Sequence, residues 1–456
     1  MIYDFIIIGG GPCGIVSSWL LSKQYKILLI EKDNDIGGCH KVIRNNNLFT
    51  EHGPRVYSNN YVNFMNILGD MNLNFDDFFV PYEFSISTIS GETVYDISFR
   101  EFMILSFYFI RFIINDNYSR TLSLDEFMIN NNFNETTKDL FDRICRLTDG
   151  VGSNKYSVYE FFQLLNQNLF YKLYQPNNPN DTHLFKSIKE KLLNNNVDIK
   201  LNTKITKLNY DEKINKIISV NNIKCNNVII ATPLTNYLEI IKNSNLEKYI
   251  NYDNIFKFNQ YNKYDTYIPI TFHWKNKLNL KKVWGFNKTK NGLAFIILSD
   301  YMKIDGTLIS TCFTKVNDEL HKLNENELIN EAFNQLKETF DLIEPDNKIL
   351  YSKIYKENDK WINEEDAFMR TNENKFIKSK TEIKNLYSLG SHNGNSYYSF
   401  TTMESATTNA IYFSNKFLKN NKRMKIKDIW TLKKSIKIII LIILLFLLYK
   451  LLYNVR

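Results

Sequence analysis

The sequence predicts an α/β fold. Three observations support this class. The chain opens with a buried-strand pattern that leads into a glycine-rich turn, a helix and a second apolar strand. Short apolar runs near residues 230 and 388 have the pattern of further strands. Between these parts lie an aromatic-rich helical stretch and a segment of mixed strands and helices.

Composition and residue spacing argue against several other classes of protein. The chain has 456 residues, of which 44% are hydrophobic, so more than one domain is expected. The five cysteines and six histidines are scattered without metal-ligand spacing, and no cleavable signal peptide precedes the first strand. This pattern favours a reducing compartment, buried free thiols and no metal site. No serine–histidine–aspartate or paired-carboxylate arrangement points to hydrolysis.

The opening residues match the start of a nucleotide-binding βαβ unit. Tyr3–Ile8 reads as a buried strand, and the pattern Gly9-x-Gly11-x-x-Gly14 then leads into a helix over 15–21. The first glycine permits the tight turn, the second lets the backbone approach a pyrophosphate, and the third lets the helix pack on the strand. The helix N-terminus offers N–H groups and the positive end of its dipole to the phosphates.

An acid at the end of the second strand narrows the choice of nucleotide. Lys26–Ile30 is apolar beyond its lysine and ends at Glu31. A carboxylate at this place accepts hydrogen bonds from both ribose hydroxyls and repels a 2′-phosphate. The sequence therefore predicts FAD or NAD rather than NADP.

The next segments point to FAD. Gly37-Gly38 follows the acid, and Glu51-His52-Gly53-Pro54-Arg55 comes after it. With these motifs the sequence resembles the flavin amine oxidase superfamily, which includes monoamine oxidases, protoporphyrinogen oxidase and phytoene-desaturase-like enzymes, and more distantly UDP-galactopyranose mutase. The resemblance implies that the Gly-Gly turn lies against the FAD pyrophosphate and that Arg55 passes near the flavin. One residue departs from the family: Cys39 stands where an arginine is usual, and Lys32, His40 or Lys41 could supply the missing charge.

Later segments extend the resemblance to about residue 417. It implies that backbone near Ile205 pairs with adenine and that the Ala231 turn closes over the nucleotide. It also implies that Gly390 and the Thr402-Met403-Glu404 turn form the far wall, with the Met403 N–H meeting the flavin carbonyl. Ser391 replaces the usual acid. The cofactor-binding residues predicted in this way are Gly9, Gly11, Pro12, Cys13, Gly14, Glu31, Lys32, Gly37, Gly38, Cys39, Gly53, Pro54, Arg55, Ile205, Ala231, Gly390, Ser391, Thr402, Met403 and Glu404.

The full fold prediction is a discontinuous FAD-binding Rossmann-like domain of the glutathione-reductase type, a mixed α+β substrate domain and a C-terminal transmembrane helix. The predicted boundaries are 1–83, 184–233 and 376–417 for the FAD-binding domain, 84–183 for a helical insertion on the substrate side, 234–375 for the substrate domain, 418–435 for a basic linker and 436–453 for the anchor.

The anchor prediction rests on the last part of the chain. The run 416–437 carries nine basic residues against one acid, which is also a pattern of nucleic-acid binding, but Ile438–Tyr449 follows as unbroken apolar or aromatic sequence. A helix extended over 430–453 would be about 36 Å long. We therefore expect a tail-anchored membrane protein with its catalytic part in the cytosol, on an endoplasmic reticulum, outer mitochondrial or virion membrane, and no nucleic-acid partner.

The resemblance implies an FAD-dependent oxidoreductase that oxidises a C–N or C–C bond of a small or hydrophobic substrate by hydride transfer to noncovalent FAD. Catalytic residues stay unassigned, although Lys281 or Lys282 falls in the region where many of these oxidases hold a lysine. Two alternatives stay open: a non-redox flavoenzyme like the mutase, against which Ser391 counts, and a catalytically silent protein that keeps the fold. The electron acceptor and the oligomeric state stay undetermined.

Overall fold

The computed structural model describes residues 2–46, 48–82, 97–115, 118–168, 170–262, 265–281, 285–286, 289–364, 376–398 and 400–454. Its centre is a seven-stranded sheet in the order β8-β2-β1-β11-β10-β9, with β19 also paired to β11. The strands are β1 (Ile2–Ile8), β2 (Ile27–Ile30), β8 (Val197–Lys200), β9 (Leu208–Asp211), β10 (Lys216–Val220), β11 (Ile223–Ile230) and β19 (Leu386–Ser388).

Strands from three distant parts of the chain run parallel and end together. Ile8 pairs with Ile30 on one side and with Ile230 on the other, and Ile230 pairs with Ser388. β2 and the final residues of β1 and β11 are continuous buried apolar runs because both faces of the sheet are covered there. The discontinuous Rossmann-like domain predicted from the sequence is confirmed.

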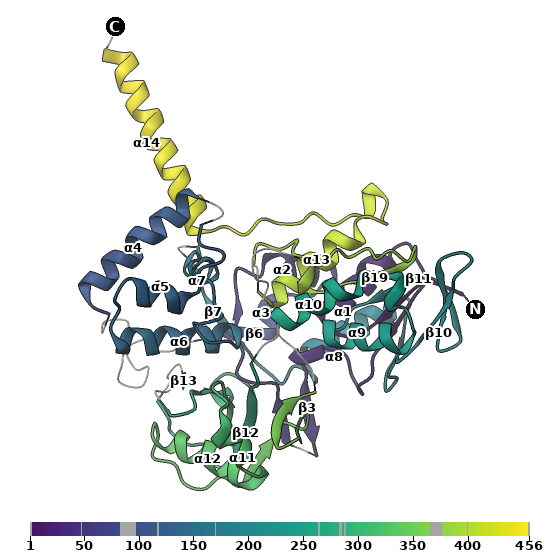
Figure 1. Cartoon of the computed structure of the whole chain (residues 1–456), viewed down its shortest axis with the longest axis horizontal. Coiled ribbons are helices and arrows are strands. Elements are labelled where there is room, and N and C mark those ends of the chain that lie inside the picture. The colour runs from purple at the N-terminus through teal and green to yellow at the C-terminus, as the bar shows by residue number, and fades with distance from the viewer. Residues whose placement is uncertain are drawn as a thin grey trace.

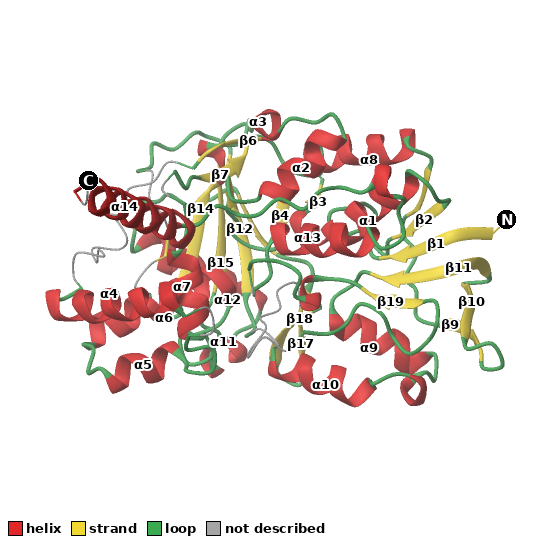
Figure 2. Cartoon of the chain, turned by 90° about the horizontal axis from the view of Figure 1, so that it is seen from above, coloured by secondary structure: helices red, strands yellow, loops and turns green. Residues whose placement is uncertain are grey.

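Helices cover both faces of this sheet (Figure 2). One face holds α1 (Pro12–Ser22), α2 (Val62–Asp70), α8 (Leu184–Asn194) and α13 (Met403–Ser414) over a core that includes Phe5 and Ile7. The opposite face, with Ile6 and Ile8, packs on α9 (Leu234–Asn243), next to α10 (Tyr252–Tyr261). Odd and even residues of β1 thus enter different cores, as the alternation of a strand requires.

A helical insertion lies to one side of this domain (Figure 1), with α4 (Phe99–Ile114), α5 (Leu124–Asn130), α6 (Glu135–Asp149) and α7 (Val158–Leu165). Three of these helices begin with the same capping box. A serine at the N-cap accepts a backbone N–H, and a glutamate three residues later bonds back to it, at Ser98, Ser123 and Ser157. The aromatic stripes inside the insertion form its core, as their helical spacing predicted.

A second sheet lies below both parts in Figure 1, in the order β13-β14-β15-β12-β16, with every neighbouring pair antiparallel. Its strands are β12 (Ile268–Trp274), β13 (Gly285–Phe286), β14 (Leu293–Ile297), β15 (Thr307–Phe313) and β16 (Asn347–Leu350). On one face Phe272 packs on Phe333 of α12 (Glu325–Lys337). The other face meets the hairpin of β3 (Val42–Asn45) and β4 (Leu48–Glu51), where His273 Nε2 lies 3.0 Å from the Phe49 carbonyl oxygen.

The remaining elements are short. They are β5 (Tyr57–Ser58), β6 (Phe79–Pro81) and β7 (Leu173–Pro176) in one small sheet, the hairpin of β17 (Ile354–Glu357) and β18 (Lys360–Asn363), and the helices α3 (Phe75–Phe78) and α11 (Asp318–Lys322).

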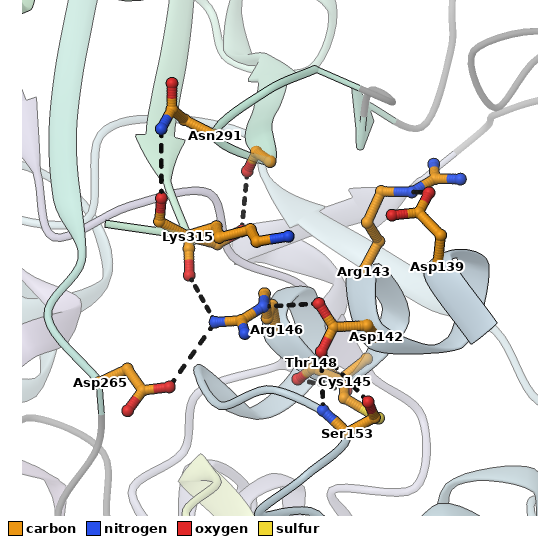
Figure 3. A network of polar contacts seen from close by, with 12 residues as sticks. Asp139, Asp142, Arg143, Cys145, Arg146, Thr148, Ser153, Asp265, Asn291 and Lys315 are labelled. Atoms are coloured by element: carbon orange, nitrogen blue, oxygen red, sulfur yellow. Dashed lines mark hydrogen bonds and ion pairs between the residues drawn. The ribbon is translucent and has the colours of Figure 1, made fainter. Parts of the chain in front are cut away.

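A polar network joins the insertion to the second sheet (Figure 3). Arg146 on α6 donates from Nε to Asp142 Oδ2 over 2.8 Å and from Nη1 to the Thr314 carbonyl oxygen over 3.2 Å. The other oxygen of Asp142 accepts the Ser153 N–H over 2.8 Å. Asp265 lies 3.6 Å from the same Nη1. The guanidinium therefore links two parts of the fold that share no sheet.

The predicted transmembrane anchor is wrong. The last helix, α14 (Leu432–Asn454), projects away from the rest of the molecule (Figure 1). Among the residues that the structure describes, none of the helices combines the length and the apolarity needed to cross a membrane. The uninterrupted apolar run Ile438–Tyr449 lies between Lys437 and Lys450, and twelve helical residues cover only about 18 Å of a hydrocarbon core of about 30 Å. The predicted span included charged side chains. The single-pass membrane localisation that was derived from it is therefore also wrong.

Candidate functional site

A groove opens where the parallel strands end. Its empty space of about 1260 Å³ includes the solvent at its open side. The lining residues are Ile8, Gly9, Gly11, Pro12, Cys13, Ile30, Glu31, Lys32, Asp33, Gly38, Cys39, His40, Thr203, Lys204, Ile205, Ala231, Thr232, Pro233, Leu234, Asn236, Glu239, Ile240, Leu389, Gly390, Ser391, His392, Thr401, Thr402 and Ala406. Thirteen of the twenty predicted cofactor residues are among them.

Two glycine turns form the floor of the groove. The Gly9 N–H donates to the Ile30 carbonyl oxygen over 2.8 Å, and its φ of +108° is one that L side chains rarely adopt. A Cβ added to Gly38 would lie 2.9 Å from the Gly11 Cα. A Cβ on Gly14 would overlap the Gly9 carbonyl oxygen, so this helix and strand can approach only through a glycine. No side chain caps the N-terminus of α1, whose N–H groups face this floor and suit an anion.

Glu31 is held rigidly at the end of β2. Its Oε2 accepts the Gly10 N–H over 2.5 Å, and its Oε1 accepts the Asp33 N–H over 3.0 Å. The side chain is buried yet lines the groove. Both oxygens keep a second acceptor site, so the carboxylate can receive two hydroxyl groups of a ligand.

The basic residues near Cys39 differ in their surroundings. Lys32 pairs with Glu364 at 2.8 Å, and Lys41 pairs with Asp33 at 2.5 Å. Burial holds the pKa of His40 well below its usual range, so this ring is neutral. By contrast, Arg55 donates from Nη1 to the Cys39 Sγ over 3.5 Å and brings a guanidinium to the Gly-Gly turn.

The far wall consists of the turn after β19 and the start of α13. The Thr402 hydroxyl accepts the Ser405 N–H over 2.9 Å and caps α13. Ser391, which replaces the family's acid, shares a 2.9 Å hydrogen bond with the Thr401 hydroxyl. Burial lowers the pKa of His392 to about 3, so this part of the wall carries no ionised group from Ser391 or His392.

Seven predicted residues do not line the groove. Gly14 packs against the Gly9 backbone and Gly37 against the Phe185 side chain, while Gly53 faces Cys312 and Arg55 contacts Cys39. Pro54 is also absent from the lining. The Met403 side chain is in the core. The Glu404 side chain, which is fully buried, bonds to Asn63 and Phe64 of α2 and so faces away from the groove.

Several lining residues were missed by sequence reasoning. Thr203, Lys204, Asn236 and Glu239 form one rim, where Lys204 Nζ lies 3.4 Å from Glu239 Oε1. The Pro233 turn that starts α9 was the available signal, because the first turn of a helix after a groove strand must flank the groove.

Of the two lysines considered for the flavin, Lys281 is exposed and Lys282 lies outside the described residues. Trp274 and Trp361 of the substrate domain pack into the core of the second sheet and donate from Nε1 to the carbonyl oxygens of Ile343 and Leu323. Both tryptophans therefore belong to the core.

The fold is shared with known oxidoreductases. The profile of an NAD(P)-binding Rossmann-like domain matches residues 7–70. An oxidoreductase from Methanosarcina mazei superposes with a TM-score of 0.65 at 14% identity, over 90% of this chain and 99% of that one. Putrescine oxidase, in a structure with putrescine bound, gives 0.64 at 12% identity, over 91% and 99%. A protein assigned as a protoporphyrinogen oxidase, from Exiguobacterium, gives 0.59 at 12% identity, over 91% and 98%.

At this level of identity the likeness establishes the fold. The predicted resemblance to the amine oxidase and protoporphyrinogen oxidase group is thus confirmed in architecture over nearly the whole chain. No curated protein matches the chain by sequence.

Proposed function

We propose that this protein is an FAD-dependent oxidoreductase that oxidises a C–N or C–C bond of a small or hydrophobic substrate by hydride transfer from carbon to FAD. The observation that supports the proposal best is the continuous groove from Glu31, past the two glycine turns, to Gly390 and Thr402. The shared fold with an amine oxidase supports the same chemistry.

The residues present fit the cofactor from end to end. Glu31 would hold the adenosine ribose hydroxyls, and the N-terminus of α1 with Gly11 would meet the pyrophosphate. Gly38 and Gly11 lie so close together that a Cβ added to Gly38 would be 2.9 Å from the Gly11 Cα. This supports the assignment, because two turns without side chains leave room for phosphates. The start of α13 at Thr402 would face the flavin. When bound, FAD supplies the hydride acceptor.

The rest of the chemistry belongs to the protein. The second sheet, which meets the β3–β4 hairpin through His273 and Phe49, would help to exclude water from a reacting substrate. The substrate domain and the segment Gly53-Pro54-Arg55 would together orient the substrate carbon. All five cysteines are free thiols, and we expect FAD to be held without a covalent bond.

A cofactor test is direct. Purified protein should show flavin absorbance, and acid precipitation should release the flavin into the supernatant. Glu31→Gln removes the charge but keeps the size, and it should lower FAD affinity at least tenfold. Glu135→Gln, an exposed surface substitution, is the matched control. A folded, colourless wild-type protein that takes up no added FAD would refute the proposal.

The oxidation itself needs a second measurement. Anaerobic mixing of the flavin-loaded protein with primary amines, amino acids or porphyrinogens should bleach the flavin for one of these classes. Full activity as a sugar-nucleotide mutase with no bleaching by any donor would instead favour the non-redox alternative.

A further inference from the structure

A second hollow lies beside α9 and is separate from the cofactor groove. α9 and α10 pack together (Figure 2), and the hollow is lined mainly by these two helices and by the chain between Phe376 and Ser388. Its empty space is about 1850 Å³, with the solvent at its open side included. Tyr237 of α9 lines the hollow, whereas Asn236 and Glu239 of the same helix line the groove.

The hollow and the groove share a wall at the turn after β19. Ser388 lines the hollow and His392 lines the groove, and Ser388 Oγ lies 2.9 Å from His392 Nε2. The Ile377 N–H, from the chain along the hollow, donates to the His392 carbonyl oxygen over 2.9 Å. These bonds hold the wall in place, so a molecule in the hollow would lie outside the proposed FAD site.

The floor of the hollow carries a polar group without a partner. The Tyr237 side chain is fully buried, and its hydroxyl makes no hydrogen bond with the residues that the structure describes. Burial and the charge of Glu382, which also lines the hollow, raise the pKa of Tyr237, so the phenol keeps its proton. A buried donor without an acceptor destabilises a folded protein, and such atoms mark the place of a ligand or an ordered water. Tyr237 therefore indicates a binding site.

The charges around the hollow favour an anion. Among the described lining residues, Lys257, Lys378 and Lys380 stand against Glu382 alone, which gives a net charge of +2. The three lysines are exposed, and within the described part of the chain none of them forms an ion pair. Glu382 Oε2 already accepts the Asn251 N–H over 3.3 Å.

The type of cation indicates which anion fits. A phosphate monoester carries a charge of roughly −1.5 to −2 near neutral pH, which balances that of the hollow. Lysines bind phosphate as point charges, whereas the planar fork that suits a carboxylate belongs to arginine. The described lining contains lysines and no arginine.

The rest of the lining suits a flat organic body beside the anion. Ile255 and Phe258 of α10 are buried and give the hollow an apolar part. Tyr261, at the end of the same helix, is 79% exposed and also lines the hollow. An exposed tyrosine ring is a surface on which an aromatic base can stack.

We propose that this hollow binds a nucleoside monophosphate, with Tyr237 and the three lysines at the phosphate and Tyr261 at the base. A sugar phosphate would leave Tyr261 and the apolar part without contact. A nucleoside would leave Tyr237 and the lysines without an anion. The site goes beyond the proposed oxidoreductase function and does not depend on it.

Three compounds test which parts of the ligand are recognised. They are AMP, adenosine and ribose 5-phosphate, titrated by calorimetry into flavin-loaded protein from which unbound FAD has been removed. Bound FAD would occupy the groove, so the heat reports on the hollow. AMP should bind at least tenfold more tightly than either of the others. Added salt should weaken the binding of AMP and leave that of adenosine unchanged.

Substitutions assign the site to the hollow. Tyr237→Phe should weaken AMP binding at least fivefold without lowering the melting temperature, because the hydroxyl that it removes has no protein partner. The double variant Lys378→Gln/Lys380→Gln should weaken it at least tenfold. Tyr355→Phe and Lys242→Gln, at exposed positions that line neither space, are the matched controls and should change nothing.

The possible results separate the hollow from the groove. Equal binding of the three compounds, or no binding of AMP, overturns the site. Wild-type affinity in both lining variants overturns its location, as does binding that is lost in Glu31→Gln instead. Should Tyr237→Phe not fold, the lysine variant still decides, because its side chains are on the surface. In a colourless protein, AMP binding that is weakened by the lining variants and kept in Glu31→Gln would support the hollow, and the oxidoreductase proposal alone would fail.

Discussion

Glu404 offers the sharpest test of the site, because it was predicted to bind the cofactor and its side chain faces elsewhere. Its carboxylate accepts the Asn63 N–H at 3.0 Å from Oε1 and the Phe64 N–H at 3.1 Å from Oε2, and the Asn63 side-chain amide donates to Oε1 over 2.6 Å. These N–H groups belong to the first turn of α2, which no local side chain caps. Glu404 therefore caps α2 from another helix.

The cost of Glu404→Ala follows from these contacts. Two buried backbone N–H groups would lose their acceptor at about 1–3 kcal/mol each. Relief from burying a charged carboxyl offsets part of this loss, since burial raises the pKa of Glu404 to about 7. We expect the free energy of unfolding to fall by about 2–4 kcal/mol, and by less in Glu404→Gln, which keeps one acceptor.

Urea titration followed by circular dichroism measures the effect, with flavin content recorded for the same samples. Glu135→Ala, in the first turn of α6 and exposed, should change stability by less than about 0.5 kcal/mol. A loss below about 1 kcal/mol in Glu404→Ala would refute the capping role. Loss of flavin at unchanged stability would instead indicate that Glu404 contributes to cofactor binding.

Three further predictions concern the core of the fold. Gly14→Val should abolish FAD binding, because its side chain overlaps the Gly9 carbonyl oxygen, and flavin absorbance after purification checks this. Arg146→Ala should lower stability by about 2–3 kcal/mol, because it leaves Asp142 and the Thr314 carbonyl without their donor; limited proteolysis should then cut the helical insertion first. Glu51→Gln should remove a pH dependence. Its folded pKa of about 7 exceeds the unfolded value, so its stabilisation is complete below about pH 4.5 and is lost as pH rises through 7. Parallel stability curves of wild type and variant between pH 5 and 8 would contradict this.

Local sequence patterns predicted the cofactor groove well. The positions of Gly9, Gly11 and Gly14 after β1 and of Glu31 after β2 were predicted correctly. The backbone conformation of a tight turn and the burial of an apolar strand depend on near neighbours, so a local pattern is enough to predict them. Gly390 and Thr402 were placed at the far wall by their order after an apolar strand. What failed was the interpretation of the last helix as a membrane span. Hydropathy over a window does not weigh where the charges of Lys437 and Lys450 cut the apolar run.

The sequence by itself determined a βαβ unit with glycine turns after its first strand and an acid at the end of its second, since those constraints lie within some thirty residues. The tertiary structure alone decided which distant side chains meet. Arg55 supplies a charge beside Cys39, Glu404 caps a helix 340 residues earlier in the chain, and Ser310 comes to face Glu51. The physical reason is that burial and charge pairing depend on contacts between elements, and a single sequence records the residues but not those contacts.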